Sequence, residues 1–132
     1  MRRRLISLTG LALALATALA VATVAHAAAP PAPSVPDLVD ASDSDVSLSN
    51  NVTNDATPTF TVIAGVTQAG MTVTIYTVPV DGDTKVPVGT GTVDGAGNAS
   101  VTTSAIADEV YNVTATTMNG VGEESTDSIP LE

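Results

Sequence analysis

The chain has 132 residues and a formal net charge of −10, with 14 Asp and Glu against four Lys and Arg, and no cysteine. All three arginines and the single histidine lie within residues 1–27, so the remainder has one cation, Lys85, against 14 carboxylates, a net charge of −13. This composition excludes disulfides, thiolate or imidazole metal sites and Ser-His-Asp or Cys-His catalysis after residue 27, and it leaves too few cations to bind nucleic acid or an anionic membrane.

Residues 1–27 have the three parts of a secretory signal peptide. Arginines at positions 2–4 precede an apolar run from Leu11 to Ala22, and Ala25-His26-Ala27 provides a small-residue cleavage site. A membrane anchor is the alternative, but threonines interrupt the run and no basic cluster follows it. We therefore expect cleavage near Ala27 and a secreted, extracellular product that does not contact a membrane.

Two segments without a clear strand pattern follow. Residues 28–36 contain prolines at 30, 31, 33 and 36, which predict a stiff, extended spacer without a core of its own. The single domain is then expected at 37–132. Its first part, up to Asp55, is rich in Asp, Asn and Ser, which favour turns. A short first strand is predicted at Val46–Leu48.

From residue 59 onward, apolar and polar residues alternate with the period of two that is typical of strands. Glycine-rich turns interrupt the alternation, and no segment shows helical spacing. Pro87 favours an edge position for the strand that contains it. About seven short strands at this spacing predict an all-β fold, an antiparallel β-sandwich. The later strands are expected at Thr59–Ala64, Met71–Val78, Lys85–Val93, Ala99–Thr103, Val110–Met118 and Thr126–Leu131.

The apolar members of these alternating runs form the predicted core. Phe60 is the only phenylalanine in the chain, so we expect it at the centre. Tyr111 begins a strand after a turn, where sandwich domains often place a tyrosine whose hydroxyl returns to an upstream backbone group. The predicted inward residues are Phe60, Val62, Val73, Ile75, Val101, Tyr111, Val113, Ala115, Ile129 and Leu131.

The order and spacing of several of these runs carry a resemblance. The most specific part extends from Asn51 to Thr61, and the runs Gly70–Tyr76 and Tyr111–Thr116 match later strands. Residues 36–132 thereby resemble the bacterial Ig-like repeats of large surface adhesins and biofilm-associated proteins. The resemblance implies an Ig-like sandwich, a non-catalytic role in surface attachment, and calcium near the junction between repeats.

Five aspartates lie between positions 37 and 55, beside several asparagines. Calcium prefers such oxygen-rich, flexible clusters, and a divalent ion would offset the repulsion between crowded carboxylates. Two interpretations stay open, a solvated acidic loop and a weak calcium site. The expected ligands are Asp37, Asp43 and Asp45, with Asp40 and Asn50 as the less secure candidates.

Other possible chemical groups have simpler structural explanations. The acidic pairs Asp81/Asp83, Asp108/Glu109 and Glu123/Glu124 lie in predicted turns and lack the aromatic platforms of a glycoside hydrolase cleft. The glycines at 89, 91, 95 and 97 precede strands rather than helices, so we interpret them as hairpin or bulge glycines and not as a phosphate loop.

Three classes of function follow from these observations. The first is a secreted, non-catalytic, monomeric module that contacts an extracellular protein or a matrix component. The second is a small ligand-binding or carrier domain, which would require a deep apolar pocket. The third is an enzyme or an inhibitor of one. No catalytic residue and no cofactor other than calcium is predicted.

Overall fold

The computed structural model describes residues 27–44, 47 and 50–131. Residues 1–26 of the predicted signal peptide (1–27) lie outside this part, as do Val46 and Leu48 of the predicted first strand. The described chain is all-β apart from one short 3-10 helix, and none of its helical segments could cross a membrane. The elements are β1 (Asp37–Leu38), β2 (Thr59–Ile63), η1 (Val66–Gln68), β3 (Thr72–Pro79), β4 (Val86–Thr92), β5 (Asn98–Thr102) and β6 (Tyr111–Met118).

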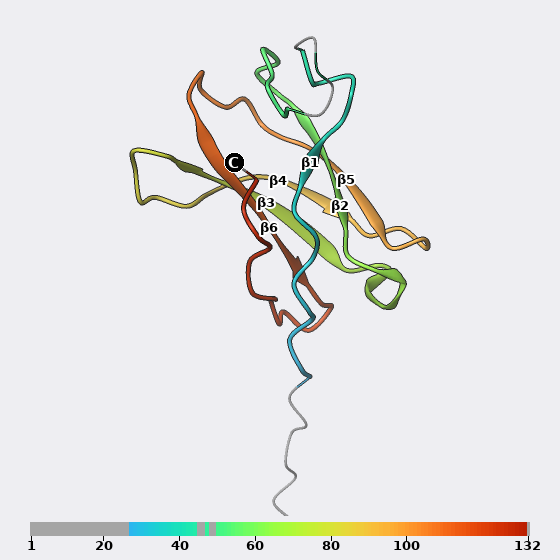
Figure 1. Cartoon of the computed structure of the whole chain (residues 1–132). Coiled ribbons are helices and arrows are strands. Elements are labelled where there is room, and N and C mark those ends of the chain that lie inside the picture. The colour runs from blue at the N-terminus through green and yellow to red at the C-terminus, as the bar shows by residue number, and fades with distance from the viewer. Residues whose placement is uncertain (1–26, 45–46, 48–49, 132) are drawn as a thin grey trace, which may run out of the picture.

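The strands form two antiparallel sheets that face one another (Figure 1). One sheet has the order β1-β2-β5 and the other has the order β4-β3-β6. In the second sheet, β3 pairs with β4 on one side and with β6 on the other. The predicted antiparallel sandwich is confirmed, and β4, which contains Pro87, lies at a sheet edge as expected.

The core lies between the sheets and consists mainly of small, branched side chains. Along β3, Val73 and Ile75 are fully buried, as the alternation predicted. Phe60 of β2 is 4% exposed, and its register partner Val101 on β5 is 0% exposed. β-Branched side chains suit a pleated surface because their restricted rotamers pack well there. The buried apolar residues are Leu38, Phe60, Val62, Val73, Ile75, Val88, Val93, Ala99, Val101, Val113 and Ala115.

The prediction for the C-terminal segment was wrong in one respect. Residues 126–131 do not form a regular strand, and Ile129, predicted to face inward, is 74% exposed. The segment still lies along β6, where Leu131 pairs with Val113. Leu131 and Tyr111 are partly buried against the core rather than inside it.

Serine side chains explain why this segment is irregular. Ser128 donates its N–H to the carbonyl of Ala115 (2.8 Å) and accepts the N–H of Ala115 on its own hydroxyl (3.0 Å). Ser125 makes the same double contact with Thr117, at 2.8 and 3.0 Å. A hydroxyl therefore takes the place of a strand carbonyl at both positions. The two-residue alternation is lost, and Ile129 turns to solvent.

The predicted spacer is extended but packs against the domain. Pro30, Pro33 and Pro36 are buried. Ser34 donates its N–H to the carbonyl of Ile63 (2.8 Å) and accepts the N–H of Ile63 on its hydroxyl (2.9 Å). Because proline lacks an N–H, it suits the outer edge of a sheet. The segment thus lengthens the β1 edge along β2 (Figure 1).

Two glycines of β4 allow close packing between the sheets. A Cβ atom at Gly91 would lie 2.7 Å from the carbonyl oxygen of Ser100, and one at Gly89 would lie 2.9 Å from that of Thr102. β5 therefore presses its backbone against β4 and closes this side of the sandwich. These glycines were expected at hairpins or bulges, and Gly89 does lie at the β-bulge of β4, opposite Ile75 and Tyr76.

Candidate binding surfaces

The predicted calcium ligands lie at one end of the sandwich, around β1 and the segment that follows it. Asp37 and Asp40 are exposed, as is Asn50. Asp43 is 5% exposed, and one of its carboxylate oxygens, Oδ2, accepts the N–H of Asn51 at 3.3 Å. Its other oxygen, Oδ1, is buried without a hydrogen-bond partner. Asp45 lies outside the described residues.

No cluster of three or more acidic or histidine side chains suited to a metal occurs within residues 27–44, 47 and 50–131. A complete set of ligands would therefore need Asp45. The calcium site stays a prediction, with the buried Oδ1 of Asp43 as its most specific feature.

Several acceptors of the acidic segment are used by its own turns. Asp55 accepts the Thr57 N–H (2.9 Å) and the Ser42 hydroxyl (3.3 Å), and Ser42 in turn accepts the Thr59 N–H (3.1 Å). The Thr57 N–H holds the pKa of Asp55 below its usual value. The side chain of Asn51 accepts the N–H of Leu38 at 3.0 Å. These local contacts are what Asp, Asn and Ser favour in turns.

A hollow of about 550 Å³ opens at the same end of the sandwich, between the two sheets. Its lining is mostly apolar and includes Phe60, Ile106 and Leu131. Val52 and Val110 also line it while remaining 52% and 71% exposed, so they stand at its mouth. The core has one phenylalanine and no tryptophan, and its small side chains leave this end unfilled.

The charged side chains of this lining are both acidic. Asp108 and Glu109 line the hollow, and neither Lys nor Arg does. A smaller adjoining depression of about 250 Å³ shares these two carboxylates and adds Asp55. The sequence pattern predicted turn carboxylates at Asp108 and Glu109 but not the hollow, because its wall is built from segments distant in the chain.

Tyr111 forms part of the same wall. Partial burial raises the pKa of the Tyr111 hydroxyl, as does Glu109, whereas a hydrogen bond with the backbone of Ala107 lowers it. The Tyr111 hydroxyl thus lies near the backbone of Ala107, upstream of the strand, as expected for a tyrosine after this turn.

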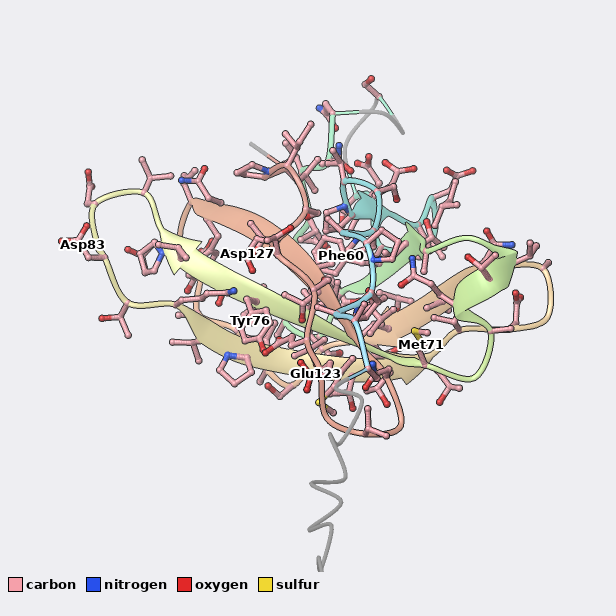
Figure 2. The ribbon with its side chains drawn as sticks, turned by 90° about the horizontal axis from the view of Figure 1, so that it is seen from below. Phe60, Met71, Tyr76, Asp83, Glu123 and Asp127 are labelled. Atoms are coloured by element: carbon pink, nitrogen blue, oxygen red, sulfur yellow. The ribbon has the colours of Figure 1, made fainter. Side chains whose placement is uncertain are left out.

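The one cation that follows residue 27 is used elsewhere. Lys85 pairs with Asp127, and its ammonium lies 3.9 Å from the centre of the Tyr76 ring. Glu124 accepts hydrogen bonds from Thr116 (2.6 Å) and from the Tyr76 hydroxyl (2.9 Å). The Thr116 hydroxyl, followed by that of Tyr76, lowers the pKa of Glu124. This polar cluster attaches the C-terminal segment to the sheet (Figure 2).

The acidic pairs considered as catalytic groups have separate structural settings. Asp81 and Asp83 are exposed in the loop between β3 and β4, and Figure 2 shows Asp83 at its tip. Glu124 is held by the polar cluster, and Asp108 and Glu109 stand at the hollow.

The family model for the bacterial Ig-like domain matches residues 29–132, a range that includes every described strand and the proline-rich segment. No curated protein matches the chain significantly, and no solved structure does.

Proposed function

Because the chain belongs to the bacterial Ig-like domain family, a non-enzymatic fold class, we propose that it is a secreted, monomeric module that attaches to a surface or matrix protein. The family match carries this proposal, since it covers residues 29–132. The signal-peptide pattern of residues 1–27 supports export.

The sheet edges favour attachment through side chains rather than by strand addition. β5 and β4 pack against each other, and the C-terminal segment covers β6. The remaining edge is the segment 34–38, where Pro36 lacks an N–H, and β4 contains Pro87 and a register shift; these features hinder pairing with another strand. A partner would therefore contact the loops and the hollow.

The test is a binding assay on intact cells and on the extracellular matrix of the source bacterium. Residues 28–132 contain both sheets, so this part can be labelled and purified. We expect saturable binding to one of the two fractions, and competition by unlabelled protein. Loss of binding after protease treatment of the cells would identify the partner as a protein. Absence of saturable binding to both fractions would refute the proposal.

The hollow favours a second candidate, a small ligand carrier. Its volume of about 550 Å³ falls in the range of about 300–1,000 Å³ typical of ligand pockets. Native mass spectrometry of the chain purified from culture medium distinguishes the two candidates. A stoichiometric small molecule that leaves on denaturation would support the carrier, and its absence would count against it.

A further inference from the structure

We infer that the hollow binds a segment of a protein partner in which a large apolar or aromatic side chain is flanked by Lys or Arg. The inference rests on the proposed function, because it assigns the surface and the chemistry of that contact. Three features support it: the apolar lining of the hollow, the exposed valines at its mouth, and its acidic rim.

The apolar part of the surface is concave and accessible. Phe60 lies at its floor with 4% exposure, and Val52 and Val110 at the mouth are 52% and 71% exposed. Exposed apolar groups around an apolar concavity are a feature of binding sites, whereas isolated surface valines are ordinary. Val121 is an isolated case of this kind, since it is also 71% exposed but lines neither described hollow.

The charged part of the surface lacks a counterion within the domain. Asp108, Glu109 and Asp55 lie around the two adjoining depressions, and no Lys or Arg lines either one. Lys85 is engaged by Asp127 and Tyr76 on the polar cluster. The positive charge that balances these carboxylates therefore has to come from outside the domain. Basic residues on the partner, placed beside the side chain that fills the hollow, would supply it.

The same charges argue against a second copy of the chain as the occupant. Two copies would each bring a net charge of −13 into contact, and the repulsion would oppose association. A basic partner instead gains from long-range attraction during encounter as well as from contact at the rim.

The chain has no tryptophan, which allows a direct assay. The probe is the pentapeptide Gly-Lys-Trp-Lys-Gly with blocked ends, and its tryptophan emission reports burial of the indole. Gly-Glu-Trp-Glu-Gly is the charge-reversed control. We expect a saturable blue shift with the lysine peptide, and an affinity at least about tenfold higher than that of the glutamate peptide at low salt.

Two matched pairs of variants locate the binding. Val110→Ser at the mouth should weaken binding of the lysine peptide by about three- to tenfold, and Val121→Ser should leave it unchanged. The double variant Asp108→Asn/Glu109→Gln should remove most of the preference for lysine over glutamate. Asp81→Asn/Asp83→Asn makes the same change in net charge in the β3–β4 loop and should retain that preference. Circular dichroism verifies that all four variants are folded.

Several outcomes would overturn the inference. If the two double carboxylate variants weaken binding of the lysine peptide equally, the peptide is attracted to the acidic chain as a whole and not to the rim. Equal affinity for the two peptides would remove the role of the rim, and an unchanged affinity in Val110→Ser would remove the role of the hollow. Sedimentation that shows dimers of the wild type but monomers of Val110→Ser would identify a second copy as the occupant. Cell binding that persists while peptide binding is absent would refute this site and leave the proposed function standing.

Discussion

The turn between β4 and β5 gives a sharp test of how the sandwich is assembled. Gly97 has φ 88° and is buried, and its carbonyl accepts the N–H groups of Ala64 (2.9 Å) and Gly65 (3.0 Å). A Cβ at this position would lie 2.4 Å from the carbonyl carbon of Gly65 and 2.5 Å from the nitrogen of Val66. Replacement of Gly97 by alanine should therefore strain its own backbone and separate the turn from the end of β2.

The expected loss of stability combines three contributions. The left-handed backbone costs a residue with a Cβ about 1–2 kcal/mol. Overpacking against backbone that cannot rotate away adds about 1–3 kcal/mol. Alanine also stabilises the protein by about 0.4–1 kcal/mol, because it allows the unfolded chain fewer conformations than glycine does. Gly97→Ala should lower the free energy of unfolding by about 2–4 kcal/mol, a large part of the roughly 5–15 kcal/mol of a typical domain.

Two other glycines separate these contributions. Gly122 has the same φ of 88°, but a Cβ there would have nothing within 4 Å, so Gly122→Ala should cost about 0.5–1.5 kcal/mol from backbone strain alone. Gly95 lies two residues before Gly97, has no positive φ and has nothing within 4 Å. Gly95→Ala should leave stability unchanged or raise it by up to about 1 kcal/mol.

Urea unfolding followed by far-ultraviolet circular dichroism measures all three variants. With a slope of about 2 kcal/mol per molar urea, the middle of the usual range, Gly97→Ala should move the midpoint down by roughly 1–2 M. The reasoning is refuted if Gly97→Ala loses no more stability than Gly122→Ala, because the close approach to Gly65 and Val66 would then carry no cost.

Three further outcomes are expected. Phe60→Ala should lose about 3–5 kcal/mol of stability, and a thermal midpoint within about two degrees of wild type would exclude Phe60 as the core anchor. Glu124→Gln should be less stable than wild type above pH 4.5, the ordinary pKa of this group. Because its folded pKa is lowered, the difference should vanish as the pH falls through that lower value; a difference that persists in acid would contradict the role of Glu124. With a calcium affinity of ~10⁻⁴–10⁻³ M, ~10 mM calcium should stabilise wild type by about 1.5–3 kcal/mol but not Asp43→Asn. Superimposable melts of wild type in calcium, chelator and magnesium would leave the acidic segment as a solvated loop.

Local patterns in the sequence were enough to predict much of the fold. The alternation through Val73 and Ile75 placed both side chains inside, because successive side chains of any strand point to opposite faces. Phe60 was predicted as a core residue for the same reason. The position of the Tyr111 hydroxyl near the backbone of Ala107 agrees with that expected of a tyrosine after a turn. These features depend on a few neighbouring residues, so they can be read from the chain.

Features that depend on distant segments could not be predicted in this way. The alternation around Ile129 looked like that of a strand, but Ser125 and Ser128 use their hydroxyls to bond β6 and turn Ile129 outward. β4 needs its glycines because the backbone of β5 lies close to them. This approach depends on how the two sheets pack, so the pattern within β4 alone does not predict it.

The candidate binding surface likewise has features that the sequence predicts and features that only the structure shows. The sequence by itself determined that one cation stands against 14 carboxylates after residue 27, and that the core would have a single phenylalanine and no tryptophan. Only the tertiary structure decided that Lys85 is bound at the polar cluster while Asp108 and Glu109 border an apolar hollow. The physical reason is that charge and side-chain volume are sums over the chain, whereas a concave surface forms only where segments distant in sequence meet.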